Sequence, residues 1–208
     1  MIKLILATNN QHKVREILAI LGKEYLRRRK IHLIPLSKLH ISLPPETGKT
    51  LKENALRKSQ TAAKLTGHWS IAEDTGLEVK ELKGAPGIYS ARFAGQNCSY
   101  EENNQKLLKL LDGLPNYRRQ ASFRTVVTLT APSGQSWIGE GTLTGFITDR
   151  LRGKSGFGYD PLFLVPEYKK TLAELGLKIK NKISHRARAF RHLKLLIDQL
   201  LKDGILRE

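Results

Sequence analysis

Hydrophobic and polar positions alternate along the chain in a pattern that predicts strands and helices in turn. Residues 2–7 form an apolar run that is typical of a buried strand. The apolar positions that follow recur at helical spacing over about residues 14–21 and stop at Gly22, a residue that commonly ends helices. A strand that leads into a helix therefore opens the protein.

The rest of the pattern predicts a mixed α/β fold. Residues 121–131 and 137–143 alternate with period two on either side of a turn at 132–134, so they predict a β-hairpin. Three more short strands are expected at residues 31–36, 70–72 and 161–165. Further helices are expected at about residues 50–65, after the capping box of Ser99 and Glu102, and along the apolar stripe from Phe190 to Leu201. We therefore expect a mixed central sheet with flanking helices.

Length and composition favour one globular domain over residues 1–208, or at most two small lobes that share one cleft. The chain has 208 residues, of which 40% are hydrophobic, and this is enough to bury an ordinary core. The single cysteine, Cys98, excludes an intramolecular disulfide and favours a reducing cytoplasm. The opening apolar run is too short for a signal peptide or a membrane span, so no membrane association is expected.

The charge balance points to an anionic partner without choosing one. Lysine and arginine number 36 against 19 acidic residues, which gives a net charge of +17. A nucleotide, a nucleic acid or an acidic surface would each fit this charge, and so would a solvated basic face with no partner. Two motifs fail on inspection: the segment 47–50 resembles the end of a P-loop, but Leu43 stands where that pattern needs glycine, and the six histidines lack zinc-binding spacing.

Four polar segments, at residues 8–13, 73–77, 156–161 and 180–186, exceed what a packed core requires. The first lies between the predicted strand and helix, where helix N–H groups suit a phosphate. In the second, Glu73 and Asp74 supply hard oxygen ligands of the kind that magnesium prefers, on a sharp turn through Thr75 and Gly76. An ordinary acidic turn is the alternative for this segment.

The other two segments suit recognition of a base. Phe157 and Tyr159 are framed by glycines and could stack on a ring, although most such aromatic residues belong to a core. Asp160 could accept a hydrogen bond from a ring N–H, or cap the next turn. His185 and Arg186 begin a predicted helix, where cations oppose the helix dipole, and this favours a ligand nearby.

Taken in order, these segments resemble the inosine triphosphate pyrophosphatase family, which hydrolyses non-standard purine nucleoside triphosphates to the monophosphate and pyrophosphate. The resemblance covers nearly the whole chain. It rests on TNNQHK at 8–13, ETGKTLKENALRK at 46–58, AEDTGLEV at 72–79, GAPGIYSARFAG at 84–95, GFGYDPLF at 156–163 and ISHRARA at 183–189. One segment alone would be modest support, but six in the same order are specific.

The resemblance implies an elongated α/β fold with a long central sheet, two lobes that enclose a nucleotide cleft, Mg²⁺ as cofactor and a homodimer. It implies Asp74 as the base and as a metal ligand with Glu46, while Glu73 assists through water. Thr75 stands where this family usually has serine, and its hydroxyl keeps the hydrogen-bond donor. The substrate-binding residues implied are Thr8, Asn9, Asn10, Gln11, His12, Lys13, Lys58, Thr75, Phe157, Gly158, Tyr159, Asp160, Lys180, His185 and Arg186.

Within that set, the resemblance implies that Thr8, Asn9, Lys13 and Lys58 hold phosphates. It implies that Phe157 stacks on the purine, that Asp160 reads its edge, that Lys180 approaches the nucleotide, and that His185 and Arg186 contact the base.

Two other functions compete with this interpretation. A Maf-type nucleotide pyrophosphatase would cut the same bond but prefer modified pyrimidines or methylated nucleotides, and the FGYDP segment argues against it. A nucleic-acid-binding module would use the positive charge, yet it would explain neither Asp74 nor the aromatic segment, so nucleic-acid binding is not expected as the main function.

Overall fold

The computed structural model describes residues 1–39 and 41–207, in which eight strands form one mixed sheet. The strands are β1 (Ile2–Leu6), β2 (Ile31–Pro35), β3 (Trp69–Val79), β4 (Pro86–Gly87), β5 (Gln120–Thr130), β6 (Ser136–Ile147), β7 (Phe163–Val165) and β8 (Lys170–Thr171). Their order is β2-β1-β3-β5-β6-β7-β8, and β4 pairs with β3. Strand β1 is parallel to β2 and β3, whereas β7 is antiparallel to β6 and β8, so the mixed α/β fold is confirmed.

In the described part of the chain, six α-helices flank these strands: α1 (Gln11–Leu21), α2 (Lys23–Arg28), α3 (Leu51–Thr66), α4 (Tyr100–Leu110), α5 (Leu172–Ile183) and α6 (His185–Lys202). The chain divides into two compact units. The first comprises Met1–Asp74, Thr125–Gly141 and Arg186–Glu208, and the second Thr75–Arg124 and Thr142–His185. Within the described residues, no helix combines the length and apolar character needed to cross a lipid bilayer. The assignment of residues 1–208 to a single domain stays a prediction.

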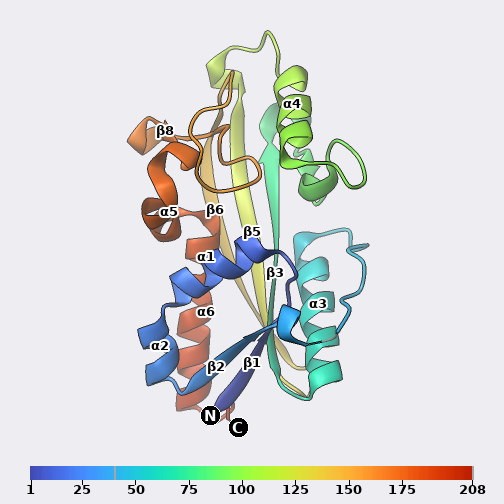
Figure 1. Ribbon diagram of the computed structural model, residues 1–208, viewed down its shortest axis with the longest axis vertical. Coiled ribbons are helices and arrows are strands. Elements are labelled where there is room, and N and C mark those ends of the chain that lie inside the picture. Colours follow the sequence, from blue (N-terminus) through green and yellow to red (C-terminus); the bar gives the residue numbers. More distant parts are fainter. Residues whose placement is uncertain (40, 208) are drawn as a thin grey trace. The chain divides into compact units, whose positions relative to one another are not determined.

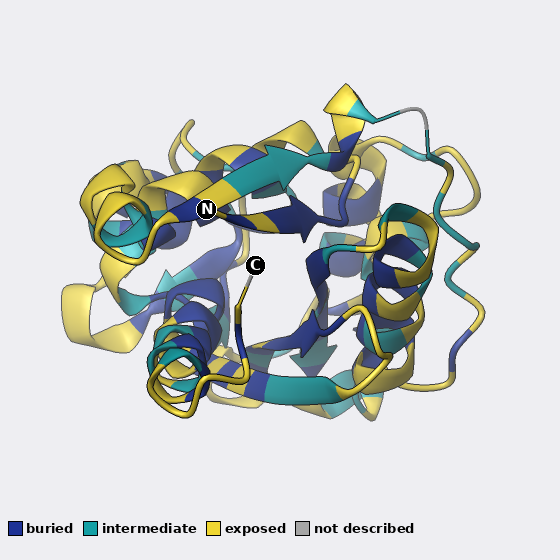
Figure 2. Ribbon diagram, turned by 90° about the horizontal axis from the view of Figure 1, so that it is seen from below, coloured by how far each residue is buried: buried dark blue, intermediate teal, exposed yellow. Residues whose placement is uncertain are grey.

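The first unit has helices on both faces of its strands (Figure 1). Alternate residues of β1 point to opposite faces, so Leu4 and Leu6 pack with α1 and α6, whereas Ile5 packs with Ala62 of α3. In Figure 2 the strands are mostly dark blue and the outer helix faces are yellow, as expected for amphipathic helices. The second unit has a core of its own, built from β3, β5, β6 and the helices α4 and α5.

Local signals in the sequence account for most helix boundaries. The side chain of Asn10 caps α1, the side chain of Thr50 caps α3, and Ser99 with Glu102 forms the predicted capping box of α4. The predicted hairpin is also confirmed, because β5 and β6 are neighbours joined at the turn in which Gly134 N–H donates to the Ala131 carbonyl.

The predicted sharp turn at residues 73–77 is wrong, because β3 continues through it without interruption. Polar side chains remain in this strand because both Glu73 and Asp74 find buried partners. Gly76 permits the close approach of β4, since a Cβ there would lie 2.6 Å from the carbonyl oxygen of Gly87. Helices α2 and α5 were also missed. Lys180 lies inside α5, a helix that the sequence pattern did not predict.

Candidate active site

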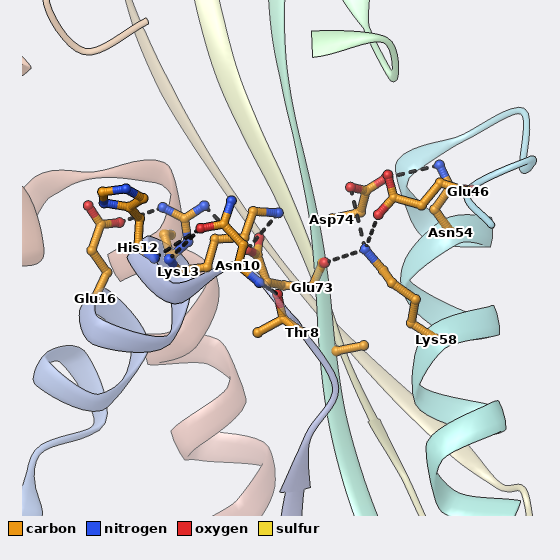
Figure 3. A network of polar contacts seen from close by, with 12 residues as sticks. Thr8, Asn10, His12, Lys13, Glu16, Glu46, Asn54, Lys58, Glu73 and Asp74 are labelled. Atoms are coloured by element: carbon orange, nitrogen blue, oxygen red, sulfur yellow. Dashed lines mark hydrogen bonds and ion pairs between the residues drawn. The ribbon is translucent and has the colours of Figure 1, made fainter. Parts of the chain in front are cut away.

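Asp74 lies at the centre of a buried polar cluster on the α3 side of β3 (Figure 3). Its carboxylate accepts a hydrogen bond of 3.0 Å from the side-chain amide of Asn54 and lies 3.7 Å from the Lys58 ammonium. That ammonium also lies 2.5 Å from Glu46 and donates to the backbone carbonyl of Glu73 at 2.9 Å. Helix α3 therefore brings Asn54 and Lys58 to the two acidic side chains, Glu46 and Asp74.

Burial dominates the electrostatics of Asp74. Loss of water around the carboxyl raises the pKa of Asp74 above its ordinary value, although Lys58, Lys13 and the Asn54 hydrogen bond act in the opposite direction. Burial alone would lower the pKa of Lys58, but the carboxylates of Asp74 and Glu46 outweigh it, so that pKa lies above its ordinary value. A buried, raised-pKa carboxyl beside a cation is typical of functional sites.

Asn54 is a site residue that the sequence reasoning missed. Its side chain is 1% exposed and links two segments of the site. The side-chain oxygen accepts from the Gly48 N–H at 2.8 Å, while the amide nitrogen donates to Asp74. Asn54 thus connects the loop that carries Glu46 to the carboxylate on β3. Its position four residues before Lys58 puts both on one helix face, and this spacing could have identified it.

Glu73 belongs to a second cluster, on the opposite side of β3 (Figure 3). Its carboxylate lies 3.0 Å from the Lys13 ammonium and 3.3 Å from the guanidinium of Arg186, and its side chain is fully buried. Arg186 also contacts Glu16 at 2.5 Å. The acidic Glu16 and Glu73 therefore alternate with the basic Lys13 and Arg186 between α1, β3 and α6. The structure does not bring the carboxylate of Glu73 into the cluster that contains Glu46.

The segment predicted as a turn at 8–13 is divided: residues 8–10 connect β1 to α1, whereas Gln11, His12 and Lys13 form the first turn of α1. Thr8 is buried, and its hydroxyl accepts from the Asn10 N–H at 3.2 Å. The Asn10 side chain accepts from the N–H groups of His12 and Lys13, so it occupies two of the donors expected for phosphate. The side chains of Asn9, Gln11 and His12 are exposed.

The second unit contains a separate cluster of predicted base-binding residues. The buried side chains of Asp160 and Lys180 lie 2.5 Å apart, and Asp160 also accepts from the Phe157 N–H at 2.8 Å. The Lys180 ammonium lies 4.7 Å from the centre of the half-buried Phe157 ring. The Gly158 carbonyl accepts from Asn104 of α4 at 3.0 Å. The Lys180 ammonium, a hydrogen-bond donor, therefore lies next to both the Asp160 carboxylate, an acceptor, and the Phe157 ring.

Three other predicted residues have different surroundings. Tyr159 is only 4% exposed and donates from its hydroxyl to the Ser90 carbonyl at 2.9 Å, so it belongs to the core, and the ring near Phe157 is that of Tyr100, with centres 5.8 Å apart. His185 is buried and stacks on Phe123, with ring centres 4.4 Å apart. Thr75 is half-buried in β3.

Comparison with known proteins identifies the family of this chain. The sequence model described as the Ham1 family matches residues 4–196. The chain belongs to the Ham1 family. Ham1 relatives include a dITP/XTP pyrophosphatase from Elusimicrobium minutum, which is 49% identical over 90% of this chain and 95% of its own length. Another dITP/XTP pyrophosphatase, from Thermoanaerobacter pseudethanolicus, is 46% identical over 97% of this chain and 99% of its own.

Solved Ham1 structures agree with the fold. A HAM1 protein from Coxiella burnetii has a TM-score of 0.86 at 38% identity, covering 96% of this chain and 100% of that one. The Ham1 protein of Staphylococcus aureus has a TM-score of 0.83 at 40% identity, covering 95% and 98% of the two chains. The family resemblance read from the six sequence segments is therefore confirmed.

Proposed function

We propose that this protein hydrolyses the non-standard purine nucleoside triphosphates ITP, dITP and XTP to the monophosphate and pyrophosphate. The observation that carries the proposal is the cluster of buried Asp74, Asn54 and Lys58 with partly exposed Glu46, which combines acidic and cationic groups suited to triphosphate chemistry. The names of the Ham1 relatives support the same substrates.

Asp74 is the base in this proposal. A water attacks the α-phosphorus, the new bond forms from the water oxygen, and the bond from the α-phosphorus to the bridging oxygen breaks to release pyrophosphate. Asp74 takes the proton of the water. The raised pKa of Asp74 makes its carboxylate a better proton acceptor, and the Asn54 hydrogen bond fixes its orientation.

The carboxylates of Glu46 and Asp74 would hold Mg²⁺. They fit this ion because both are oxygen donors and both already face one cation, the Lys58 ammonium. Magnesium commonly takes one or two carboxylates and completes its shell with water and substrate phosphates. Bound magnesium would neutralise charge on the phosphate oxygens.

Lys13 and Lys58 would neutralise the remaining phosphate charge, and Thr8 and Asn9, just before α1, would hold phosphate oxygens by hydrogen bonds. The ammonium of Lys13 is held by Glu73 at 3.0 Å, so Glu73 would act by positioning this cation. The side chain of Lys13 keeps 16% of its surface exposed, which leaves it accessible to a ligand.

Recognition of the base would use Phe157 for stacking and the pair of Asp160 and Lys180 for the ring edge. Hypoxanthine and xanthine carry a carbonyl at C6 and a proton on N1, which a cationic donor and a carboxylate acceptor can satisfy together. Adenine reverses both groups and would leave buried polar groups unpaired, a mismatch worth about 10⁴-fold or more in selectivity. We further expect His185 and Arg186 to assist at the base.

A panel of nucleoside triphosphates tests the proposal. Pyrophosphate release would be measured with magnesium for ITP, dITP, XTP, ATP, GTP and a methylated pyrimidine triphosphate. Turnover of ITP, dITP and XTP well above that of ATP would support the proposed function. Equal turnover of ATP and ITP would refute the base recognition, and preference for the pyrimidine would favour the Maf-type alternative. The homodimer and the cytoplasmic location stay predictions. Sedimentation equilibrium would test the homodimer by measuring the mass of the protein in solution.

A further inference from the structure

A hollow of about 390 Å³ opens in the first unit, at the ends of β1 and β3 where these strands begin. The N-terminus marks this end of β1 in Figure 2. Trp69 begins β3, and Asp74 follows five residues later, which corresponds to about 16 Å along a strand. The hollow is therefore distinct from the catalytic cluster. Its size lies within the roughly 300–1,000 Å³ that is usual for small-molecule sites.

The two tryptophans of the chain both line this hollow. The rings of Trp69 and Trp137 are stacked, with centres 5.6 Å apart and planes inclined by 28°. Trp69 is 7% exposed, whereas Trp137 is only partly buried and contributes surface to the hollow. Indole rings provide broad apolar faces on which a planar ligand can stack.

Basic and neutral polar groups make up the rim. Lys3 and Arg207 line the hollow and are exposed. Within residues 1–39 and 41–207, neither forms an ion pair, so both cations are available to an anion. Ser133 and Gln135 add hydrogen-bonding groups, and no acidic residue belongs to the described lining. An anionic group on a ligand would be attracted by these two cations.

We propose that this hollow is a second nucleotide site, in which a base stacks against the tryptophans and a phosphate lies at Lys3 and Arg207. Inorganic phosphate alone would not use the indole faces, and an uncharged aromatic compound would not use the two cations. A base joined to a phosphate uses both. The ligand is either a free mononucleotide or one nucleotide of a single strand, and the two sources share this chemistry.

Intrinsic tryptophan fluorescence reports on the hollow alone, because the chain has no tryptophan elsewhere. Metal-free protein would be titrated with CMP, with cytidine, with ribose 5-phosphate and with a short oligocytidylate, and absorption by the ligands would be corrected with free tryptophan. The site predicts a saturable change with CMP and apparent affinities at least about tenfold weaker for the two fragments. Oligocytidylate that binds far more tightly than CMP would identify a single strand as the source.

A double substitution, Lys3→Gln with Arg207→Gln, tests whether the fluorescence change comes from a built site. We expect it to weaken CMP or oligocytidylate binding by about tenfold or more. The matched control is Arg27→Gln with Arg28→Gln, which removes the same charge from α2, outside the hollow. The absence of any saturable change with CMP and oligocytidylate would overturn the proposal. Equal weakening by both double variants would also overturn it, because general charge would then explain the binding.

Discussion

Glu73 and Asp74 are neighbours in sequence, but their carboxylates lie on opposite sides of β3. The Glu73 side chain contacts Lys13 and Arg186, whereas the Asp74 side chain contacts Asn54 and Lys58. Successive side chains of a strand alternate between its faces, so two adjacent acidic residues serve two clusters. Substitutions at the two positions should therefore have different consequences.

Replacement of Asp74 with asparagine should remove catalysis and leave the fold intact. The shape of the side chain is kept, but the proton acceptor is lost, and loss of a general base commonly lowers the rate by about 10²–10⁴-fold. The measurement is kcat for pyrophosphate release from ITP, with circular dichroism as the check on folding. A well-folded Asp74→Asn enzyme with undiminished kcat would contradict the role of Asp74.

Glu73→Gln should instead destabilise the protein. Its carboxylate is fully buried between two cations, and removal of one partner from a buried ionic cluster costs about 3–5 kcal/mol. Urea unfolding measures this change in the free energy of unfolding. The matched control is Glu24→Gln on α2, where the contacts to Arg27 and Arg28 are exposed and a loss below about 1 kcal/mol is expected. Equal losses in the two variants would contradict the prediction.

The raised pKa of Asp74 predicts how stability depends on pH without metal. The folded state holds the Asp74 proton more tightly than the unfolded state, whose carboxyl has a pKa near 3.8. The favourable contribution is therefore full below pH 3.8 and is lost as pH rises through the raised pKa. Relative to wild type, Asp74→Asn should gain in free energy of unfolding across this window and then level off. A difference that is constant with pH would contradict the raised pKa.

Sequence periodicity was sufficient for the elements that bury one face. The hairpin of β5 and β6 and the amphipathic helices α3 and α6 were predicted because their apolar residues recur with the period of the element. Periodicity failed at β3, where Glu73 and Asp74 are both buried. The partners of both carboxylates come from residues distant in sequence. Two adjacent acidic residues without visible partners are typical of an exposed turn, so the local sequence predicted a turn.

The missing helix α5 had a different cause. Thr171 and Glu174 form a capping box that could have been recognised in the sequence, but Gly176 adopts a φ of 72° and interrupts the helical pattern two residues later. The residue types in each segment indicated phosphate, metal or base, and those assignments stay predictions, but they did not indicate which side chains would meet.

Arg119 should be a major contributor to the stability of the second unit. Its buried guanidinium donates to the carbonyls of Leu111, Leu114 and Thr148 at 2.8–3.1 Å. Arg119→Met would remove the donor from the Leu114 and Thr148 carbonyls and one of the two donors from the Leu111 carbonyl, which also accepts from the Leu114 N–H, at a cost of about 3 kcal/mol or more. Thermal unfolding measures the effect, and Arg118→Met is the control. The Arg118 side chain is half-exposed and pairs with Glu81 near the protein surface, so its loss should cost less than about 1 kcal/mol.

Gly156 should control the position of Asp160. A Cβ at Gly156 would lie 2.0 Å from the Asp160 carboxylate, and its φ of +82° is already unfavourable for other residues. Gly156→Ala should therefore displace Asp160 from Lys180 and raise KM for ITP by about tenfold or more. Gly158→Ala is the matched control, because Gly158 also has a positive φ, +63°, but its Cβ would meet nothing within 4 Å.

Both substitutions introduce backbone strain of about 1–3 kcal/mol, so both should lower the melting temperature. Only Gly156→Ala should also change selectivity, since the carboxylate proposed to accept the N1 proton is moved. The decisive measurement is the ratio of kcat/KM for ITP over that for ATP. If this ratio falls in Gly156→Ala and stays unchanged in Gly158→Ala, Asp160 recognises the base. If it falls equally in both, strain in the 156–158 loop is the cause and Asp160 loses its proposed role.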